Sequence, residues 1–335
     1  MRAILVRGGR GPAESLYIGE IDAPSPRPGE VLINVKAFGL NRMDIHQREG
    51  QYPPPPGASQ ILGVEFSGVI SELGNDVEEW KIGDEVIGLV AGGAYAELVT
   101  VPQENLIKKP QALTWAEAAA IPENFLTAFQ ALILIGSLRT KENVLIHAAA
   151  SGVGVAAIQL ARIYGAETVI GTTSTEHKIN WILGLPNGAT HAVNYKTQNF
   201  AAEVNHITKG HGADVVIDFV AQSHFVRNIE ALAVDGRMTM LALLSGSIVN
   251  SFDLSPILRK RLRIEGSTLR SRAPKYQANL ISRFETEVLQ QITGEGGTGP
   301  IRIYLHQVYP WDRIIDAHRE MESNNNLGKI IVTVA

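Results

Sequence analysis

Residues 144–166 read VLIHAAASGVGVAAIQLARIYGA, and the rest of the chain is interpreted outward from this stretch. It opens with the apolar run 144–146, which is typical of a buried parallel strand. A turn of small residues follows at 148–154, and the pattern then predicts a helix over 155–164 that ends at Gly165. Strand, glycine turn and helix in this order predict the corner of a dinucleotide-binding fold, where a helix N-terminus faces a pyrophosphate.

The glycine turn matches the dinucleotide fingerprint G-x-G-x-x-G only in part. The three glycine positions fall on Ala149, Ser151 and Gly154. The context supports the match, because a strand precedes the turn, a helix follows it, and a second strand is predicted at 168–171. The backbone is expected to approach the pyrophosphate at Gly152, Val153 and Gly154. The alternative is an ordinary strand–helix–strand unit whose glycine turn binds nothing.

The end of the second strand bears on the choice between NADPH and NADH. Folds that prefer NAD place Asp or Glu here to bind the ribose 2′-hydroxyl. This chain has the uncharged run 171–174 instead, and Lys178 follows within one helical turn. Ser174 leaves room for a 2′-phosphate and Lys178 can neutralise it, so NADP(H) is the predicted cofactor. Against this, Lys178 can equally be a solvated helix lysine, and the nearby Glu176 weakens the charge argument.

The composition is that of a globular protein long enough for two domains. The chain has 335 residues, of which 45% are hydrophobic and 19% charged, with a formal net charge of −4 and no cysteine. Without cysteine there are no disulfides, thiolate metal sites or cysteine nucleophiles. No basic block and no run of about 20 apolar residues occurs, so neither nucleic acid nor a membrane is an expected partner. A cytoplasmic location is the default expectation.

Two kinds of pattern divide the chain into domains. Residues 1–125 read as short strands separated by Gly and Pro, which predicts a small barrel-like β domain. Residues 126–266 alternate strands with helices, which predicts a doubly wound parallel sheet of six strands. The strand-like tail 330–334 is expected to pair within the β domain, so that 267–335 completes it. A long helix and a flexible turn are predicted before the tail, at 275–293 and 294–299.

Five short motifs carry a resemblance to a known family: NRMD at 41–44, GVEFSG at 63–68, GDEV at 83–86, AIP at 120–122 and ASGVG at 150–154. They resemble the quinone oxidoreductase (zeta-crystallin-like) branch of the medium-chain dehydrogenase/reductase superfamily. Three further runs are more similar still to its animal tumour-suppressor-inducible members: 48–59, 268–272 and 326–330. The resemblance implies an α/β protein with a GroES-like β-rich catalytic domain and a Rossmann NADP-binding domain. It also implies NADPH-dependent quinone reduction.

The metal-ligand positions of the superfamily depart from the zinc-dependent pattern. Zinc-dependent alcohol dehydrogenases carry Cys in C-x-x-D and His in G-H-E, where this chain has Asn41 and Val64. No metal site is therefore expected, and Asp44 and Glu65 are expected to make structural hydrogen bonds that hold an interdomain cleft. Without a Lewis acid, quinones or other conjugated acceptors are favoured, because they delocalise the incoming charge over an oxygen. The sequence reveals no other strong electrophile or relay, and does not separate one-electron from hydride transfer.

The resemblance implies that Asn41, Tyr52 and Thr127 lie beside the nicotinamide, and they are the predicted catalytic residues. Cofactor contacts are predicted for Tyr52, Thr127, Gly152, Val153, Gly154, Ser174, Lys178, Tyr195, Leu241, Leu243, Leu269 and Asn326. Leu241 and Leu243 lie at the carboxyl end of a strand predicted at 236–243, where ligands of this fold bind, whereas Leu269 and Asn326 are carried over from the resemblance without a further reason. Alternatives stay open: Tyr52 can stack on its neighbouring prolines, Thr127 can bond to its own helix, and Tyr195 can be a strand-end aromatic.

Two other functions compete with quinone reduction. An NADPH-dependent alkenal, enone or enoyl-thioester reductase on the same fold needs a proton donor, for which Tyr52 is the evident candidate. The other is a non-enzymatic NADPH-binding or crystallin-like role, in which the acidic charge balance counts against RNA as a ligand. The resemblance also implies a homodimer, formed by edge-to-edge pairing of the dinucleotide-domain sheets.

Overall fold

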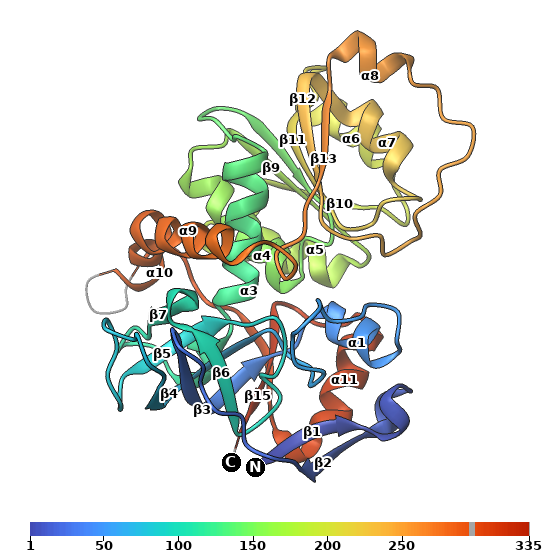
Figure 1. Cartoon of the computed structure of the whole chain (residues 1–335). Helices are drawn as coiled ribbons and strands as arrows, with labels where there is room; N and C mark the ends of the chain where they lie inside the picture. The colour runs from blue at the N-terminus through green and yellow to red at the C-terminus, as the bar shows by residue number, and fades with distance from the viewer. Residues whose placement is uncertain (295–298, 335) are drawn as a thin grey trace. The chain divides into compact units, whose positions relative to one another are not determined.

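The computed structural model describes residues 1–294 and 299–334, so most of the turn predicted at 294–299 lies outside the described residues. The chain divides into two compact units (Figure 1). One unit combines Met1–Leu126 with Leu269–Ala335, and the other is Thr127–Thr268. We describe each unit by itself.

The second unit is built on a six-stranded parallel sheet with the order β10-β9-β8-β11-β12-β13. Its strands are β8 (Asn143–Ile146), β9 (Thr168–Thr173), β10 (His191–Asn194), β11 (Ala213–Asp218), β12 (Leu232–Met240) and β13 (Arg263–Gly266). Numbered along the unit, this order is 3-2-1-4-5-6, which is that of a doubly wound dinucleotide-binding sheet. The strand order reverses between β8 and β11, and the glycine turn leaves the sheet at the end of β8.

Helices cover both faces of this parallel sheet (Figure 1). They are α4 (Gly152–Ile163), α5 (Glu176–Gly184), α6 (Phe200–Ile207), α7 (Phe225–Ala231) and, beside β12, α8 (Ser255–Lys260). α6 and α7 share one apolar core with alternate residues of the strands, among them Leu145, Ile170 and Val216. α4 contacts β8 and β9, and α5 contacts β9 and β10. The near-continuous apolar runs of the predicted strands follow from this burial on two faces.

The first unit is dominated by a seven-stranded sheet with the order β14-β15-β3-β4-β5-β7, in which β6 also pairs with β3. Its strands are β3 (Glu30–Gly39), β4 (Glu65–Leu73), β5 (Glu85–Leu89), β6 (Leu98–Pro102), β7 (Leu106–Lys108), β14 (Leu305–Pro310) and β15 (Lys329–Thr333), beside a separate ribbon of β1 (Arg2–Val6) and β2 (Leu16–Glu20). β15 pairs antiparallel with β3. The prediction that the tail returns to the β domain is thereby confirmed.

The helices of the first unit include α1 (Arg42–Arg48), α2 (Trp115–Ala119), α9 (Pro274–Phe284), α10 (Gln290–Thr293) and α11 (Ile314–Ser323), and α3 (Pro122–Phe129) ends beyond its boundary. The single helix predicted at 275–293 is wrong in detail, because a π-helical segment at Glu285–Leu289 separates α9 from α10. The core of the unit centres on Phe38, Phe66 and Tyr95. Together the two sheets confirm the predicted α/β class, a β-rich domain plus a doubly wound parallel sheet.

One helical run, Trp115–Ile135, is 21 residues long and apolar enough to cross a membrane by length and composition alone. Of its most apolar window, 83% is buried inside the protein. Core helices of globular proteins pass the same test of length and composition, so this run is weak evidence for a membrane span.

Candidate functional site

The glycine turn after β8 forms the predicted phosphate corner. The Ser151 hydroxyl caps α4 by accepting a hydrogen bond from the Gly154 amide at 3.1 Å. The other N–H groups at the start of the helix have no acceptor within it, and the positive end of the helix dipole lies here. A Cβ on Gly154 would lie 2.5 Å from the carbonyl oxygen of Ala148, so only glycine allows the helix to pack this closely on the turn. The corner therefore fits a bound pyrophosphate at the residues Gly152, Val153 and Gly154.

The carboxyl ends of β9 and β10 bring together the residues predicted to hold a 2′-phosphate. Ser174 lies in the bend after β9, Lys178 in the first turn of α5, and Tyr195 directly after β10. The Tyr195 amide donates to the carbonyl oxygen of Thr173 at 3.1 Å, which places the two strand ends side by side. The carboxylate of Glu176 accepts from the Asn194 side chain at 3.4 Å, so the nearest acidic group is engaged within the protein.

The carboxyl ends of β11 and β12 carry the other predicted cofactor residues of this unit. β12 ends at Met240, three residues earlier than expected, so Leu241 and Leu243 lie in the loop that follows it. The Leu241 amide donates to the carbonyl oxygen of Asp218 at 2.7 Å, and Leu241 is half-buried, whereas Leu243 is 53% exposed. Thr127 lies buried in α3.

Four buried polar residues that the sequence analysis did not single out lie together at the end of β8: His147, Thr172, His224 and Asn228. His147 Nδ1 lies 2.8 Å from the Thr172 hydroxyl, and its Nε2 lies 2.7 Å from Asn228 Oδ1. His224 packs edge-on to His147, with ring centroids 4.9 Å apart. Burial lowers the pKa of both His147 and His224 to about 4, so both rings are neutral at pH 7.

In the first unit, the buried Lys329 bonds to Asn41, the first residue of the NRMD motif. The Lys329 ammonium donates to Asn41 Oδ1 at 2.6 Å and to Asn124 Oδ1 at 3.2 Å, and pairs with Glu65 Oε1 at 2.5 Å. Asn41 Nδ2 donates to the same Glu65 oxygen at 2.9 Å, and the Glu123 amide donates to the other at 2.8 Å. Both Glu65 oxygens are thus engaged inside the first unit. The sequence offered one hint of this lysine, a charged residue opening the apolar run of β15.

A second buried chain of hydrogen bonds runs from Arg48 to Asp44 in the first unit. Arg48 Nη1 donates to His318 Nδ1 at 3.1 Å, and His318 Nε2 lies 3.2 Å from the Tyr95 hydroxyl. That hydroxyl donates to Asp44 Oδ2 at 3.1 Å. Burial, with the Arg48 charge, lowers the pKa of His318 to about 3, so the ring is neutral. Because Nδ1 accepts from Arg48, the single ring proton is on Nε2, which donates it to the Tyr95 hydroxyl oxygen. Burial raises the pKa of Asp44 to about 6, although hydrogen bonds from the Asn41 amide and Tyr95 oppose this.

Tyr52, Leu269 and Asn326 complete the predicted residues of the first unit. Tyr52 lies in the loop after α1, half-buried, with its ring centroid 5.7 Å from the guanidinium carbon of Arg270. Leu269 is buried and its carbonyl oxygen accepts from the Gln277 side chain at 3.0 Å. Asn326 is buried and its amide donates to the Gly328 carbonyl oxygen at 3.0 Å. The roles assigned to these residues stay predictions.

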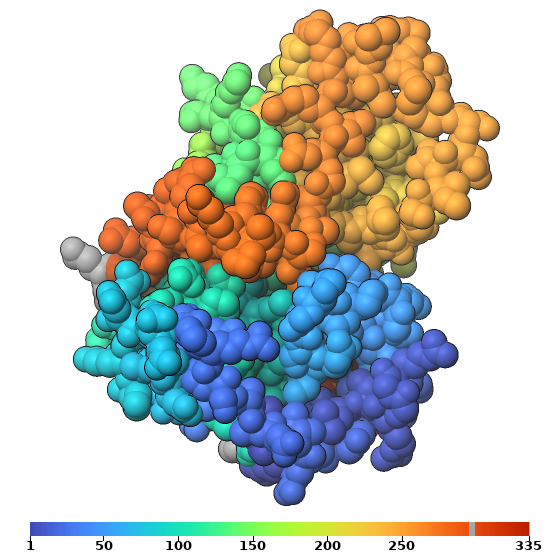
Figure 2. Space-filling model, in the orientation of Figure 1, coloured from blue at the N-terminus to red at the C-terminus, as the bar shows by residue number. Residues whose placement is uncertain are grey.

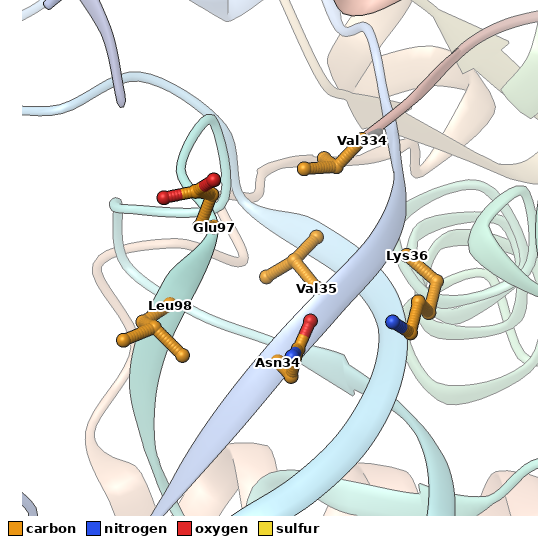
Figure 3. Close-up of a pocket in the computed structure, with 6 residues that line it drawn as sticks. All are labelled: Asn34, Val35, Lys36, Glu97, Leu98 and Val334. Carbon is orange, nitrogen blue, oxygen red and sulfur yellow. The ribbon is translucent and has the colours of Figure 1, made fainter. Parts of the chain in front are cut away.

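Metal-ligating groups and surface hollows are the two other features that bear on the site. Over residues 1–294 and 299–334, no group of three or more His, Asp or Glu side chains could hold a metal ion. A surface hollow in the first unit, drawn in Figure 3, is lined by Asn34, Val35, Lys36, Glu97, Leu98 and Val334. It lies where β3 exchanges β6 for β15 as its neighbour, and none of the predicted site residues lines it.

Comparisons with known proteins match the whole chain. Family models for "Zinc-binding dehydrogenase" and "Alcohol dehydrogenase GroES-like domain" match residues 152–286 and 27–111. The synaptic vesicle membrane protein VAT-1 homolog of Rattus norvegicus is 32% identical over 323 residues, covering 92% of this chain and 78% of that protein. The Danio rerio VAT-1 homolog is also 32% identical, and the chain spans 65% of its length. The Homo sapiens quinone oxidoreductase is 29% identical, covering 99% of this chain and 97% of that protein.

Three solved structures share the fold over the full chain. The Escherichia coli quinone oxidoreductase complexed with NADPH is 27% identical with a TM-score of 0.86, covering 99% of this chain and 100% of that one. An NAD-dependent alcohol dehydrogenase is 32% identical with a TM-score of 0.84, covering both chains fully. The CurK enoyl reductase is 29% identical with a TM-score of 0.85, covering 100% of this chain and 99% of that one.

Proposed function

The chain belongs to the medium-chain dehydrogenase/reductase family, as an oxidoreductase of its zinc-independent branch, and we propose that it reduces quinones with NADPH. One observation carries the proposal. At a metal-ligand position of the zinc enzymes stands Asn41, whose side chain is bound to the Lys329 ammonium and the Glu65 carboxylate. Acceptors that need no Lewis acid are favoured by such a site. When bound, the nicotinamide cofactor supplies the reducing equivalents, and the chain's own residues bind and orient the acceptor.

The test is NADPH consumption, followed at the nicotinamide absorbance, with ortho- and para-quinones in parallel with 2-alkenals and enones. The protein is first treated with EDTA, so that dependence on metal is measured in the same experiment. Turnover of quinones that survives EDTA is the expected result. Loss of turnover on EDTA treatment, restored by a divalent metal, would contradict the metal-free proposal.

The second candidate function is reduction of a carbon–carbon double bond in an alkenal, enone or enoyl thioester. The likeness to the CurK enoyl reductase, at 29% identity over the whole chain, favours it specifically. Turnover of alkenals or enones without quinones would select this candidate. Tight NADPH binding without turnover of either class would select the non-enzymatic role instead.

The proposed cofactor is NADP(H) rather than NAD(H). The loop after β9 has no acidic residue up to Thr175, and Lys178 lies in the following turn, with the nearby Glu176 carboxylate bonded to Asn194. A lysine at this place neutralises a 2′-phosphate, whereas an acid would bind a 2′-hydroxyl. Relatives of both kinds exist, since one solved structure holds NADPH and another is described as NAD-dependent.

We expect Lys178→Glu to lower the preference for NADPH over NADH, measured as the ratio of the two kcat/KM values, by about 10- to 100-fold. A charge-assisted hydrogen bond is worth roughly 1.5–3 kcal/mol, which corresponds to this range. Lys209→Glu is the matched control, because Lys209 precedes β11 and so lies at the opposite, amino-terminal edge of the parallel sheet. An unchanged ratio in Lys178→Glu would remove this residue from the cofactor site.

We also propose that two copies of the chain pair through β13. This strand is the edge of the six-stranded sheet and, among the described residues, pairs with β12 alone. The helix α8 comes shortly before β13 in the chain and contacts β12. Its Leu258 is 80% exposed, and Leu254, directly before the helix, is 68% exposed. In Figure 2 the orange surface over α8 is open to solvent. An unpaired edge next to exposed leucines is a template for a second copy, which would extend the sheet.

We expect Leu258→Asp to convert the dimer to a monomer, halving the mass measured by sedimentation or light scattering. A carboxylate placed at the centre of an apolar contact is left without a partner, which opposes association. Ile82→Asp is the control, since Ile82 is 64% exposed but belongs to the first unit. A wild-type protein that is monomeric at micromolar concentration would contradict the proposal outright.

A further inference from the structure

Arg270 is a buried arginine whose hydrogen-bonding capacity is mostly unused. Its side chain is 3% exposed, and its Nε donates to the Ala91 carbonyl oxygen at 2.7 Å. Neither Nη1 nor Nη2 has a hydrogen-bond partner within the described part of the chain. Leaving buried charged donors unpaired is costly, so such groups in native proteins call for a partner from outside the chain.

Gly92 and Tyr52 lie beside the Arg270 guanidinium. A Cβ built on Gly92 would lie 3.4 Å from Nη2, so the backbone of this glycine runs next to that nitrogen. The Tyr52 ring flanks the guanidinium, at 5.7 Å from its carbon to the ring centroid. A planar cation beside an aromatic ring makes a flat site with donors at one end, which suits a planar ligand with an oxygen at its edge.

The helix α1 carries two buried oxygen atoms, on Asp44 and Gln47, that have no hydrogen-bond partner among the described residues. Asp44 is fully buried, and its Oδ2 accepts from the Asn41 amide at 2.8 Å and from the Tyr95 hydroxyl. Its Oδ1 has no partner among the described residues, and neither has the buried Oε1 of Gln47, one turn further along the same helix. The charges of Asp44 and Arg270 act on each other's pKa, yet the described residues contain no ion pair between the two side chains. In native proteins, unpaired buried donors and acceptors are satisfied by bound water or by a ligand.

We infer that Arg270 binds the acceptor's oxygen, and that its two Nη groups stabilise the negative charge which this oxygen gains on reduction. The inference rests on the proposed function and deepens it, because it names the feature that a substrate must have. That feature is a carbonyl oxygen conjugated with the carbon or ring that is reduced, as in quinones and enones alike. The acceptor gains a hydride from the reduced nicotinamide, which is left oxidised, and its oxygen becomes an oxyanion. A proton from water then completes the neutral product.

Arg270 would thereby be the electrophile that the sequence analysis did not find. A guanidinium cannot donate its proton away at physiological pH, so it acts by charge and by two parallel hydrogen bonds. Donors that are already oriented and desolvated stabilise an oxyanion far better than water does, and removing one such donor typically costs about 100- to 1000-fold in kcat.

The experiment compares Arg270→Met with Arg272→Met. Arg272 is the matched control, because its guanidinium packs over the Tyr276 ring at 4.5 Å. We expect Arg270→Met to lower kcat/KM for quinones or enones about 100-fold or more, and Arg272→Met to lower it less than threefold. The melting temperature of Arg270→Met should equal or exceed that of the wild type, because the variant removes a buried and mostly unpaired charge. A merely structural arginine would instead lower the melting temperature and leave kcat/KM of the folded protein unchanged, which would overturn the inference.

A binding measurement separates this inference from the proposed function. The probe is 4-nitrophenol, whose phenolate form absorbs visible light, titrated with pH in the presence of the protein, with and without NADP⁺. We expect the bound phenol to ionise at lower pH than the free phenol, and Arg270→Met to abolish this shift. If the shift occurs but neither quinones nor enones are turned over, the proposed function fails and the oxyanion site stands. If quinones are turned over but Arg270→Met keeps wild-type kcat/KM, the inference fails and the function stands.

Arg270→Lys keeps the experiment decisive should Arg270→Met fail to fold. Lysine retains the positive charge but not the forked pair of donors. A loss of kcat/KM of at least 10-fold in this variant supports the inference. Wild-type kcat/KM together with a wild-type 4-nitrophenol shift would show that the forked donors are not used, and would overturn it.

Discussion

Replacing Lys329 with methionine should lower the free energy of unfolding by about 3–5 kcal/mol, the range typical of breaking a buried ion pair by removing one partner. The ammonium is the only positive charge bonded to Glu65 in the described part of the chain, and Glu65 is fully buried. Without it, Asn41 Oδ1 and Asn124 Oδ1 also lose their donor. Urea unfolding followed by circular dichroism measures the change.

Two variants make this result specific. Lys109→Met also removes a mostly buried lysine, but its partner Glu85 is half exposed, so the cost should stay near 1 kcal/mol. Adding Glu65→Gln to Lys329→Met removes the stranded negative charge and should recover part of the loss. Equal effects of Lys329→Met and Lys109→Met would contradict the view that desolvation of Glu65 dominates.

The bonded group of Lys329, Asn41 and Glu65 stands where the zinc-dependent enzymes carry metal ligands. Asn41 and Val64 replace the two residues that bind zinc in the zinc-dependent enzymes, while the acidic Glu65 is retained. A buried carboxylate is stable only beside a cation, and here the cation is the ammonium group of Lys329. The Asn41 side chain, which accepts from Lys329 and donates to Glu65, connects the two charges.

Much of the fold could be predicted because local patterns express it. The central strands of the parallel sheet, such as β8 and β11, are largely apolar and buried, and the glycine turn marks where the sheet reverses its order. β7 escaped prediction because it has three residues, and β14 because its run LHQVYP is half polar and mostly accessible. The interruption between α9 and α10 escaped because nothing in the run ETEVL distinguishes a π turn from an α turn.

The residues of the candidate site could be predicted where they are close in sequence, and were missed where their partners are remote in sequence. The phosphate corner and the loop with Ser174 and Lys178 follow directly after strands, so neighbours in sequence are neighbours in space. Lys329 and Arg270 were missed because their partners are remote: Lys329 bonds to Asn41 across 288 residues, and Arg270 bonds to Ala91 across 179. No periodicity within one element encodes contacts of that range. An unpaired buried nitrogen, moreover, is visible only once every neighbour has been placed.

Acid should destabilise this protein below about pH 6.5, because its buried histidines are neutral in the folded state. His147 and His224 have pKa values lowered to about 4, and His318 to about 3, against about 6.5 in an unfolded chain. Between those values the unfolded chain binds more protons than the folded one. The free energy of unfolding therefore falls as pH falls below about 6.5, and keeps falling to about pH 4.

Asp44 works in the opposite direction and confines the effect. Its pKa is raised to about 6, so between about pH 6 and 4 the folded protein holds a proton that the unfolded chain has released. In the first unit this cancels most of the contribution of His318. In the second unit His147 and His224 are opposed by Asp218, whose pKa is also raised by burial. Counting only His147, His224, His318 and Asp44, unfolding at pH 5 takes up about two protons, a slope of roughly 3 kcal/mol per pH unit.

A variant assigns that slope to the histidines of the second unit. His147→Gln keeps a donor and an acceptor for Thr172 and Asn228 but cannot be protonated, so it should reduce the slope between pH 5 and 6 by about one third to one half. Urea titrations at several pH values measure the slope in the wild type and in the variant. An unchanged slope in His147→Gln would mean that His147 binds as many protons in the folded protein as in the unfolded chain. That result would contradict the prediction, which rests on the full burial of His147, since burial disfavours the charged ring.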